Sequence, residues 1–219
     1  GSPVLPDIDG IEYALTSNDM FHFKSLPKSI LIVGGGYISC EFAGIMNGLG
    51  VKTTQYFRAG QILRGFDDEA RDIIADEMCK RGVDLQADMN VAKIEKIPEG
   101  VKITDTKGGL IEVDAVMFAT GRTPNTKGLV ADDVAVEIGP RGEILVDAYS
   151  QTSVPSIYAL GDVTDRVNLT PVAIREAMCF VATVFRGVPM PVDHDLIPTA
   201  VFTQPEMGTV GLSEEVAAA

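Results

Sequence analysis

The 219-residue sequence has no tryptophan, only two histidines and three cysteines, and far fewer basic than acidic residues. With 18 lysines and arginines against 31 aspartates and glutamates, its formal net charge is −13. This balance argues against nucleic acid or an anionic membrane surface as a partner, because phosphate groups select basic surfaces. Any anion site must therefore be local, built from backbone amides and a few basic side chains.

Long apolar runs and a leader pattern are also missing. No run reaches the roughly 18 apolar residues that a membrane span needs, and the opening GSPVLPDIDG lacks the basic-then-apolar order of a signal peptide. We therefore expect no membrane segment and a cytoplasmic or similarly reducing compartment. Cys40, Cys79 and Cys179 have neither disulfide-motif nor zinc-motif spacing, which predicts buried free thiols and no metal site.

The clearest positive pattern is SILIVGGGYISCEF, residues 29–42. Residues 29–33 form an apolar, β-branched run that predicts a strand buried on both faces. Apolar residues at helical spacing follow, and a second strand is expected at 51–57. The helical positions are Ile38, Phe42, Ile45 and Leu49, before a stop at Gly50. A strand, a glycine turn, a helix and a strand within about 30 residues make one βαβ unit.

Further elements follow in both halves of the chain. Asp67 or Asp68 is expected to cap a helix whose inner face holds Ala70, Ile73, Ile74 and Met78. Short strands at 83–87, 91–97, 101–105 and 110–113 predict an antiparallel meander, and 115–120 predicts another buried strand. Beyond these, we expect a strand at 156–163, a helix at 169–185 capped by Thr170, and a strand-rich unit from 193. The fold class is therefore α/β, with a Rossmann-like parallel sheet plus an antiparallel meander, followed by a second unit.

The glycine turn carries the first functional signal. Gly34 and Gly36 occupy the first two positions of a G-x-G-x-x-G pattern, and Ser39, which is small enough, takes the third. In that pattern the helix beginning near Tyr37 aims its free N–H groups at a pyrophosphate. The turn therefore predicts a dinucleotide site, with a tight ligand-free turn as the alternative.

The end of the second strand indicates which dinucleotide. An NAD site usually has an acidic residue here for the ribose 2′-OH. In QYFRAGQILR there is none; Tyr56 lies near the expected position, and Arg58 and Arg64 follow. Two guanidinium groups suit a 2′-phosphate, which predicts NADPH. The alternative is two solvated surface arginines.

Five stretches together resemble the glutathione reductases of plants and many bacteria, a group of FAD-dependent pyridine-nucleotide–disulfide oxidoreductases. These stretches are IVGGGYISCEFAGIMNGLG, RGFDDEARD, FATGRTPNTKGL, VDAYSQTSVPSIYALGDVTDRVNLTPVA and AVFTQPEMGTVGLSEE. The trypanothione reductases are the nearest competitor, through ILRGFD and YALGDVTDRVNLTPVAI. The resemblance implies a parent enzyme that passes hydride from NADPH to FAD and on through a redox disulfide to glutathione disulfide.

The resemblance also implies a domain organisation. It assigns 1–124 to an NADPH-binding domain with an entry segment at 1–28, 125–193 to the C-terminal part of an FAD-binding domain, and 194–219 to the start of an interface domain. The redox cysteine pair, the FAD fingerprint and the His–Glu dyad of the family have no counterpart here. We therefore expect a fragment of a homodimeric enzyme, inactive by itself, with His22 and His194 as surface or loop histidines. A non-catalytic dinucleotide-binding module is the alternative.

Several residues gain roles on the NADPH side. The resemblance implies that Tyr37 covers the nicotinamide pocket and that the backbone N–H of Ile38 binds the nucleotide. It places the Glu41 carboxylate near the flavin and nicotinamide, as a supporting residue, and Gly121 and Arg122 near the NADPH ribose. Cys40 has no redox role in the family and is expected to be structural.

On the FAD side, the resemblance implies that Asp162 binds the ribityl chain or ribose side of the cofactor. It directs the helix N-terminus at Leu169 and Thr170 towards the pyrimidine edge of the flavin. Met178 stands where some glutathione reductases have an arginine that faces the disulfide substrate. That difference weakens the assignment of glutathione disulfide only slightly.

Overall fold

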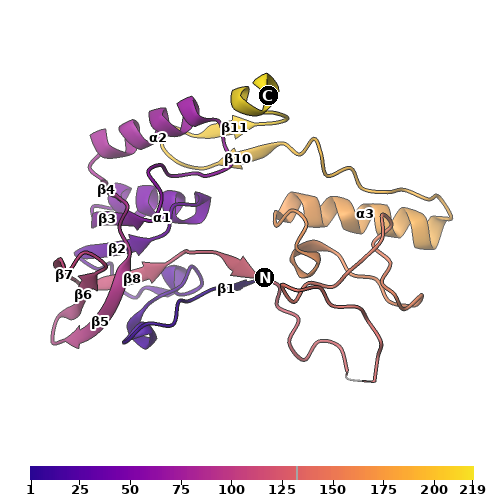
Figure 1. Cartoon of the computed structure of the whole chain (residues 1–219), viewed down its shortest axis with the longest axis horizontal. Coiled ribbons are helices and arrows are strands. Elements are labelled where there is room, and N and C mark those ends of the chain that lie inside the picture. Colours follow the sequence, from indigo (N-terminus) through magenta and orange to yellow (C-terminus); the bar gives the residue numbers. More distant parts are fainter. Residues whose placement is uncertain (132) are drawn as a thin grey trace. The chain divides into compact units, whose positions relative to one another are not determined.

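The computed structural model describes residues 1–131 and 133–219, which form two compact units. The larger unit comprises 3–121 and 198–219, and the smaller unit comprises 1–2 and 122–197. Each unit is described by itself (Figure 1). Among the described residues, no helix combines the length and the apolar character needed to span a bilayer.

A four-stranded parallel sheet is the centre of the larger unit, with the strand order β4-β3-β2-β8. The strands are β2 (Ser29–Val33), β3 (Lys52–Phe57), β4 (Asp84–Ala87) and β8 (Ala115–Phe118). This confirms the predicted βαβ unit and the Rossmann-like α/β class. The assignment of 83–87 to the meander is wrong, because the helix after β3 returns the chain so that β4 pairs parallel with β3.

Helices α1 (Tyr37–Gly48) and α2 (Asp68–Lys80) pack on the face of the sheet that presents Ile30 and Ile32. The buried stripe of α1 differs from the predicted one, since Ile45 and Leu49 are 47% and 57% exposed. The buried residues of α1 are Ser39, Cys40, Ala43 and Met46, of which the first three are small. In α2 the predicted Ile74 and Met78 are buried, whereas Ile73 is exposed.

The opposite face of the parallel sheet, which presents Leu31 and Val33, packs against an antiparallel sheet of three strands. These are β5 (Val91–Ile97), β6 (Gly100–Asp105) and β7 (Leu110–Val113), which confirms the rest of the predicted meander. Figure 1 shows α2 above the parallel sheet, with β5 and β6 on its lower side. The larger unit also contains two short 3₁₀ helices, Ile11–Tyr13 and Asp19–His22.

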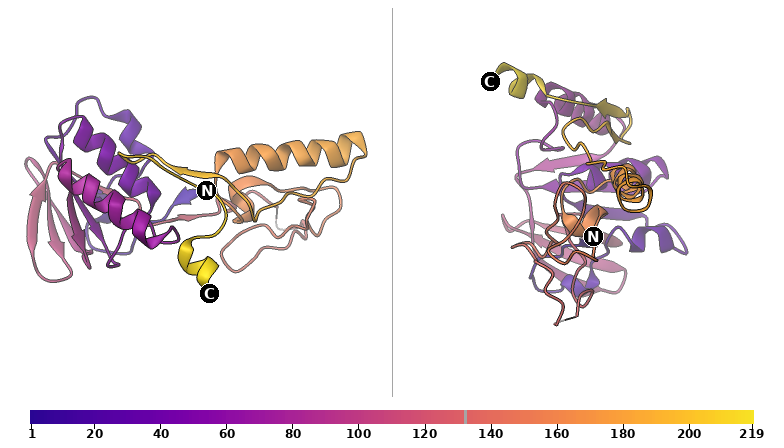
Figure 2. Two further views of the ribbon diagram at one scale, coloured as in Figure 1. Left: turned by 90° about the horizontal axis from the view of Figure 1, so that it is seen from above. Right: turned by 90° about the vertical axis from the view of Figure 1, so that its right-hand side faces the viewer.

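Residues 198–219 complete the larger unit. Strands β10 (Thr199–Val201) and β11 (Met207–Thr209) form an antiparallel hairpin, and the short helix α4 (Glu214–Ala218) follows. The Val201 side chain is fully buried in the same core cluster as α1 and α2. Figures 1 and 2 both show α4 beside the N-terminal end of α2. The three predicted domain ranges stay predictions.

The smaller unit has one long helix, α3 (Thr170–Arg186), and a 3₁₀ helix, Gly161–Thr164, that packs against it. The other short elements are β1 (Ser2–Pro3), which crosses the boundary, and β9 (Arg122–Thr123). The predicted strand at 156–163 is wrong: its first half forms only an isolated bridge from Tyr158 to Gln151, and its second half is the 3₁₀ helix. Thr170 is the first residue of α3 rather than its cap, because Leu169 has the extended backbone of the N-cap.

Candidate functional site

Gly34, directly after β2, has a conformation that only glycine adopts easily. Its φ is 141°, and a Cβ atom there would lie 2.3 Å from the carbonyl oxygen of Ala119. Its N–H donates to the carbonyl of Tyr56 over 2.8 Å, which fixes the turn to the neighbouring strand β3. Any side chain at this position would therefore strain the backbone and collide with the end of β8.

Gly36 is different, because nothing in the protein requires it to be glycine. Its φ of −85° and ψ of 178° suit any residue, and no atom lies within 4 Å of the position that a Cβ would take. A glycine with open space in front of it is what close approach of a pyrophosphate to the backbone requires. The geometry therefore leaves room for a ligand directly before α1.

The N-terminus of α1 opens onto this space without a side-chain cap. Gly36 is its N-cap and has no side chain that could cap the helix, and the first turn has no acidic residue. Ser39 is fully buried and donates its hydroxyl to the carbonyl of Gly36 over 2.7 Å, so the third motif position also steadies the turn. The first N–H groups of a helix lack intrahelical acceptors and carry partial positive charge, which makes this end suitable for an anion.

Gln55, for which the sequence predicted no role, stabilises the glycine turn from the neighbouring strand β3. It is fully buried in β3, and its Nε2 lies 2.9 Å from the Gly34 carbonyl oxygen and 3.4 Å from Cys40 Sγ. Its Oε1 has no partner among the described residues. Burial raises the pKa of the Cys40 thiol to about 11, which agrees with its expected structural role. The sequence signal that could have revealed this role is the amide side chain of Gln55 within a strand that is buried on both faces.

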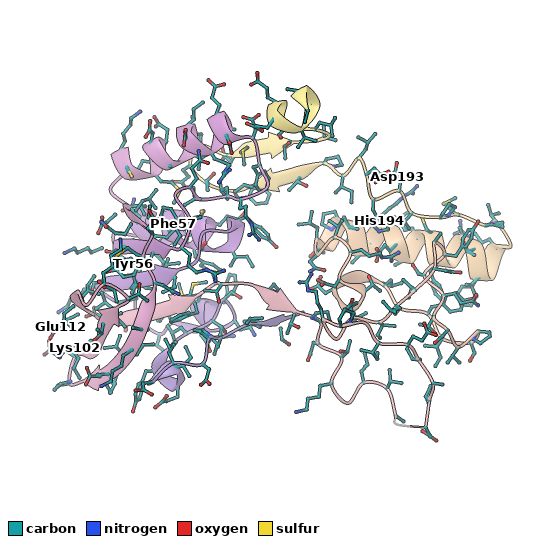
Figure 3. All side chains as sticks on the ribbon, viewed as in Figure 1. Tyr56, Phe57, Lys102, Glu112, Asp193 and His194 are labelled. Atoms are coloured by element: carbon teal, nitrogen blue, oxygen red, sulfur yellow. The ribbon has the colours of Figure 1, made fainter. Side chains whose placement is uncertain are left out.

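Arg58 and Arg64 lie in the loop between β3 and α2, after Tyr56 and Phe57 at the end of β3 (Figure 3). Both arginines are exposed, and neither forms an ion pair with any carboxylate in the part of the chain that the structure describes. Tyr56 is only 6% exposed and packs in the core with β5–β7. Burial and then the nearby Asp105 and Asp84 raise the pKa of its phenol.

Three further predicted residues lie on α1. Tyr37, its first residue, and Ile38 are partly buried against the core cluster on the helix side of the sheet. The Glu41 carboxylate accepts the backbone N–H of Phe202 over 2.9 Å, so it joins α1 to the β10–β11 hairpin. Glu41, which was predicted to support the flavin and nicotinamide site, therefore already has a hydrogen-bond partner within the protein.

Gly121 and Arg122 stand where the chain passes from one unit to the other. Gly121, in the larger unit, has a φ of 144°, and its carbonyl accepts the N–H of Val4 over 3.0 Å. Arg122 is in the smaller unit, where its guanidinium donates to the carbonyl of Gly1. The structure thus gathers the glycine turn and the two loop arginines in one unit, and places Arg122 in the other.

The residues predicted to bind FAD lie in the smaller unit. The Asp162 carboxylate is 34% exposed and lies 2.7 Å from the N-terminal ammonium group of Gly1. Leu169 is the N-cap of α3 and offers no side-chain cap, and Thr170 is exposed. Like α1, α3 therefore begins without a side-chain cap or an acidic residue in its first turn.

A buried ion cluster holds the turn that carries Asp162. Glu176 of α3 is 1% exposed and accepts the Gly161 N–H over 2.5 Å, with Arg166 Nη2 and His194 Nε2 each 2.8 Å from its Oε1. His194 lies in the loop after α3, as expected, but its 21% exposed ring also hydrogen-bonds this buried carboxylate, which the sequence did not predict; Figure 3 shows it beside α3. The signal was a glutamate on the apolar stripe of α3, between Val172 and Cys179.

Comparison with known proteins gives a consistent picture. Residues 1–177 match the family model of the pyridine nucleotide-disulphide oxidoreductases. A glutathione reductase of Burkholderia cepacia is 50% identical over 97% of this chain, and a trypanothione reductase of Trypanosoma congolense is 44% identical over 99%. The solved structure of a Cu(II) complex of the HOCl-induced flavoprotein disulfide reductase RclA from Escherichia coli covers 99% of the chain, with a TM-score of 0.93 and 29% identity.

The chain spans about half the length of the proteins it resembles. It covers 47% of the Burkholderia relative, 45% of the Trypanosoma relative and 50% of the Escherichia coli chain. The family match, by contrast, extends over most of the present chain, including the glycine turn, both loop arginines and the first turns of α3. The chain belongs to the pyridine nucleotide-disulphide oxidoreductase family.

Proposed function

We propose that this chain is the NADPH-binding part of a glutathione-disulfide reductase. The observation that carries the proposal is Gly36, a glycine that no protein contact demands, placed before a helix N-terminus without a cap. The 50% identity to a glutathione reductase over almost the whole chain supports the parent activity.

The residues present fit NADPH in both shape and charge. Gly34 forms the turn, the space at Gly36 admits the pyrophosphate, and the N–H of Ile38 is in the first turn of α1, where it faces that end of the helix. Arg58 and Arg64 would bind the 2′-phosphate with charge-assisted hydrogen bonds. The nicotinamide and ribose side would be completed in this unit by Tyr37, Glu41 and Gly121, and a ribose contact of Arg122 stays a prediction.

In the smaller unit, Asp162, Leu169 and Thr170 would hold FAD. The partly exposed carboxylate of Asp162 can accept hydrogen bonds from the hydroxyl groups of the ribityl chain or ribose. The N-terminus of α3 would stabilise negative charge at the edge of the flavin ring. The chemistry that the two cofactors supply is transfer of a hydride from NADPH to FAD, followed by transfer of electrons to a disulfide. The residues of this chain bind and orient them.

The whole protein, in this proposal, is a larger cytoplasmic homodimer with a redox-active disulfide that reduces glutathione disulfide. A trypanothione reductase is the second candidate, favoured by the relative that is 44% identical over 99% of the chain. Steady-state reduction of the two disulfides by the whole protein with NADPH distinguishes these candidates. A higher kcat/KM for trypanothione disulfide would overturn the glutathione assignment.

NADPH binding is tested by titrating the chain with NADPH and NADH and following nucleotide fluorescence. We expect tighter binding of NADPH, and Arg58→Ala or Arg64→Ala should each weaken it about ten- to a hundredfold. This follows because a hydrogen bond to a charged group contributes roughly 1.5–3 kcal/mol. NADH binding should change little.

Arg81→Ala is the matched control, since Arg81 is an exposed arginine of the same unit at the far end of α2. It should leave both affinities unchanged. Equal binding of NADPH and NADH by the unmodified chain would show that the arginines do not read a 2′-phosphate. Binding of neither nucleotide would leave the ligand-free turn as the correct interpretation.

A further inference from the structure

The loop of residues 58–66, here called the β3–α2 loop, carries both arginines that would bind the 2′-phosphate. Between them, Ile62 and Leu63 are only 1% and 0% exposed and belong to the core cluster beneath α1 and α2. Arg58 and Arg64 flank this buried pair on either side and are exposed. The position of the two guanidinium groups therefore depends on what holds Ile62 and Leu63.

Leu63 is held in an unfavourable backbone conformation. Its φ is 54°, in the left-handed region that a leucine adopts only when its surroundings enforce it. Its N–H donates to the carbonyl of Gly35 over 2.6 Å, which joins the loop to the glycine turn. A Cβ at Gly35 would lie 3.1 Å from Phe57 Cβ, so this close approach favours glycine. Arg64 thus begins from a backbone that is fixed relative to the pyrophosphate end of the site.

Arg71 of α2 holds the loop from the other side. Its side chain is 11% exposed, its Nε donates to the carbonyl of Ile62 over 2.7 Å, and its Nη1 pairs with the Asp68 carboxylate. A second contact joins Gln61 Nε2 to Asp72 Oδ1 over 2.6 Å. The planar guanidinium fixes the direction of both of its bonds at once, which a lysine ammonium does not.

We propose that Arg71 is a positioning residue that makes the site selective for NADPH over NADH by holding the β3–α2 loop. The inference rests on the proposed function, because it concerns the 2′-phosphate of that same site. Arg71 is not itself offered to the nucleotide, since Nε and Nη1 are already engaged with Ile62 and Asp68. It acts through Arg64 and Arg58, whose hydrogen bonds to a phosphate require defined directions.

Removal of the guanidinium leaves the Ile62 carbonyl without its donor and allows the strained Leu63 to relax. The 2′-phosphate contacts should then weaken, whereas the pyrophosphate contacts at Gly34 and Gly36 stay. The loss is therefore expected in NADPH affinity and not in NADH affinity. A residue that only stabilised the fold would move both affinities together.

The experiment compares Arg71→Met and Arg71→Lys with the unmodified chain and with Arg81→Met, a control at the C-cap of the same helix. Dissociation constants are measured for NADPH, NADH, 2′,5′-ADP and 5′-ADP, together with the melting temperature. We expect Arg71→Met to weaken NADPH and 2′,5′-ADP about tenfold, which corresponds to one lost directed contact, and to change NADH and 5′-ADP by less than about twofold. Arg71→Lys should also lose most of the preference for NADPH over NADH, because lysine retains the positive charge but not the planar guanidinium with its fixed donor directions.

Each other result decides against the inference. Equal losses for all four nucleotides would make Arg71 merely structural, and unchanged selectivity in Arg71→Lys would show that charge alone suffices. If Arg71→Met does not fold, the result for Arg71→Lys still decides. If substitution of Arg58 or Arg64 removes the preference for NADPH but substitution of Arg71 does not, only this inference is overturned. A chain with no preference for NADPH overturns the proposed function as well.

Discussion

Helices α1 and α2 pack on the same face of the same sheet, yet their N-termini are built in opposite ways. α1 starts at Gly36 with no side-chain cap and no acidic residue in its first turn. α2 starts at Asp67, whose Oδ1 accepts the Ala70 N–H over 3.2 Å, and its first turn contains Asp68 and Glu69.

The N-terminus of α2 is also shared with α4. Asp67 Oδ2 accepts the Glu214 N–H over 3.1 Å, and Glu215 Oε1 accepts the Asp68 N–H over 3.1 Å. These two carboxylates accept hydrogen bonds from N–H groups at the N-termini of α2 and of α4. Protein side chains therefore already bind the N-terminus of α2, which carries partial positive charge. The two helices therefore differ at their caps: acidic residues bond the first N–H groups of α2, and the first turn of α1 contains none. In a chain with a net charge of −13, a first turn without acidic residues is what the proposed anion site at α1 requires.

The sharpest test of the α1 terminus compares two substitutions two residues apart. Gly34→Ala should destabilise the chain by roughly 4 kcal/mol, since the new Cβ would meet the Ala119 carbonyl at 2.3 Å and φ is 141°. For a protein of this size that corresponds to a fall in melting temperature of about 8–16 °C. Thermal unfolding followed by circular dichroism measures it.

Gly36→Ala is the matched control for stability, because its backbone and surroundings accept a methyl group. Its unfolding free energy should change by less than about 1 kcal/mol. NADPH binding should nevertheless weaken about tenfold or more, because the methyl group occupies the space of the pyrophosphate. Unchanged affinity in a folded Gly36→Ala chain would contradict ligand approach at this position.

A second substitution gives α1 the kind of N-terminus that α2 has. Gly36→Asp should add a capping carboxylate, since the extended backbone of Gly36 is that of a favourable N-cap. Stability should rise by a few tenths of a kcal/mol, while NADPH affinity should fall by roughly 3 kcal/mol, more than a hundredfold, through repulsion of the pyrophosphate. Calorimetric titration with NADPH and thermal unfolding of the same sample measure the two effects. Asn at this position is the control, because it caps without charge and should weaken NADPH binding less.

Local patterns predicted the region around the glycine turn well. The apolar run at 29–33 is β2 to the residue, and the turn, α1 and β3 follow as expected. Asp67, one of the two predicted caps, caps α2, because a short acidic side chain can accept the free N–H groups at a helix start. The resemblance to glutathione reductases added the family, which the match over residues 1–177 confirms.

Features that depend on contacts between distant residues could not be predicted in this way. The buried stripe of α1 consists of Ser39, Cys40, Ala43 and Met46. Three of these residues are small, so the hydrophobic pattern selected the larger Ile45 and Leu49, which are exposed. Residues 156–163 have the composition of a strand, but β structure needs a partner, and here Tyr158 forms a single bridge to Gln151. The contacts of Glu176 with Gly161 and His194 join segments 15 and 18 residues apart, and the sequence indicates only that a charged residue stands on an apolar stripe. Arg71 reaches back nine residues to the Ile62 carbonyl, which a helical pattern does not predict.

The smallest expected effect concerns the acid dependence of the α2 terminus, which α1 should lack. Hydrogen bonds from the backbone of Glu214 and then of Ala70 hold the pKa of the Asp67 carboxyl below its ordinary 3.8. A depressed pKa means that the contribution of Asp67 to stability is present above pH 3.8 and is lost as the pH falls through the lower value in the folded state. Amide resonances of Glu214 and Ala70 should therefore shift together in that acid range, as followed by ¹⁵N NMR spectroscopy. Asp67→Asn should abolish the shared transition, whereas the amide of Ser39 in α1 should show none in either chain. A titration at Ser39 that matches the one at Glu214 would remove the contrast between the two helix ends.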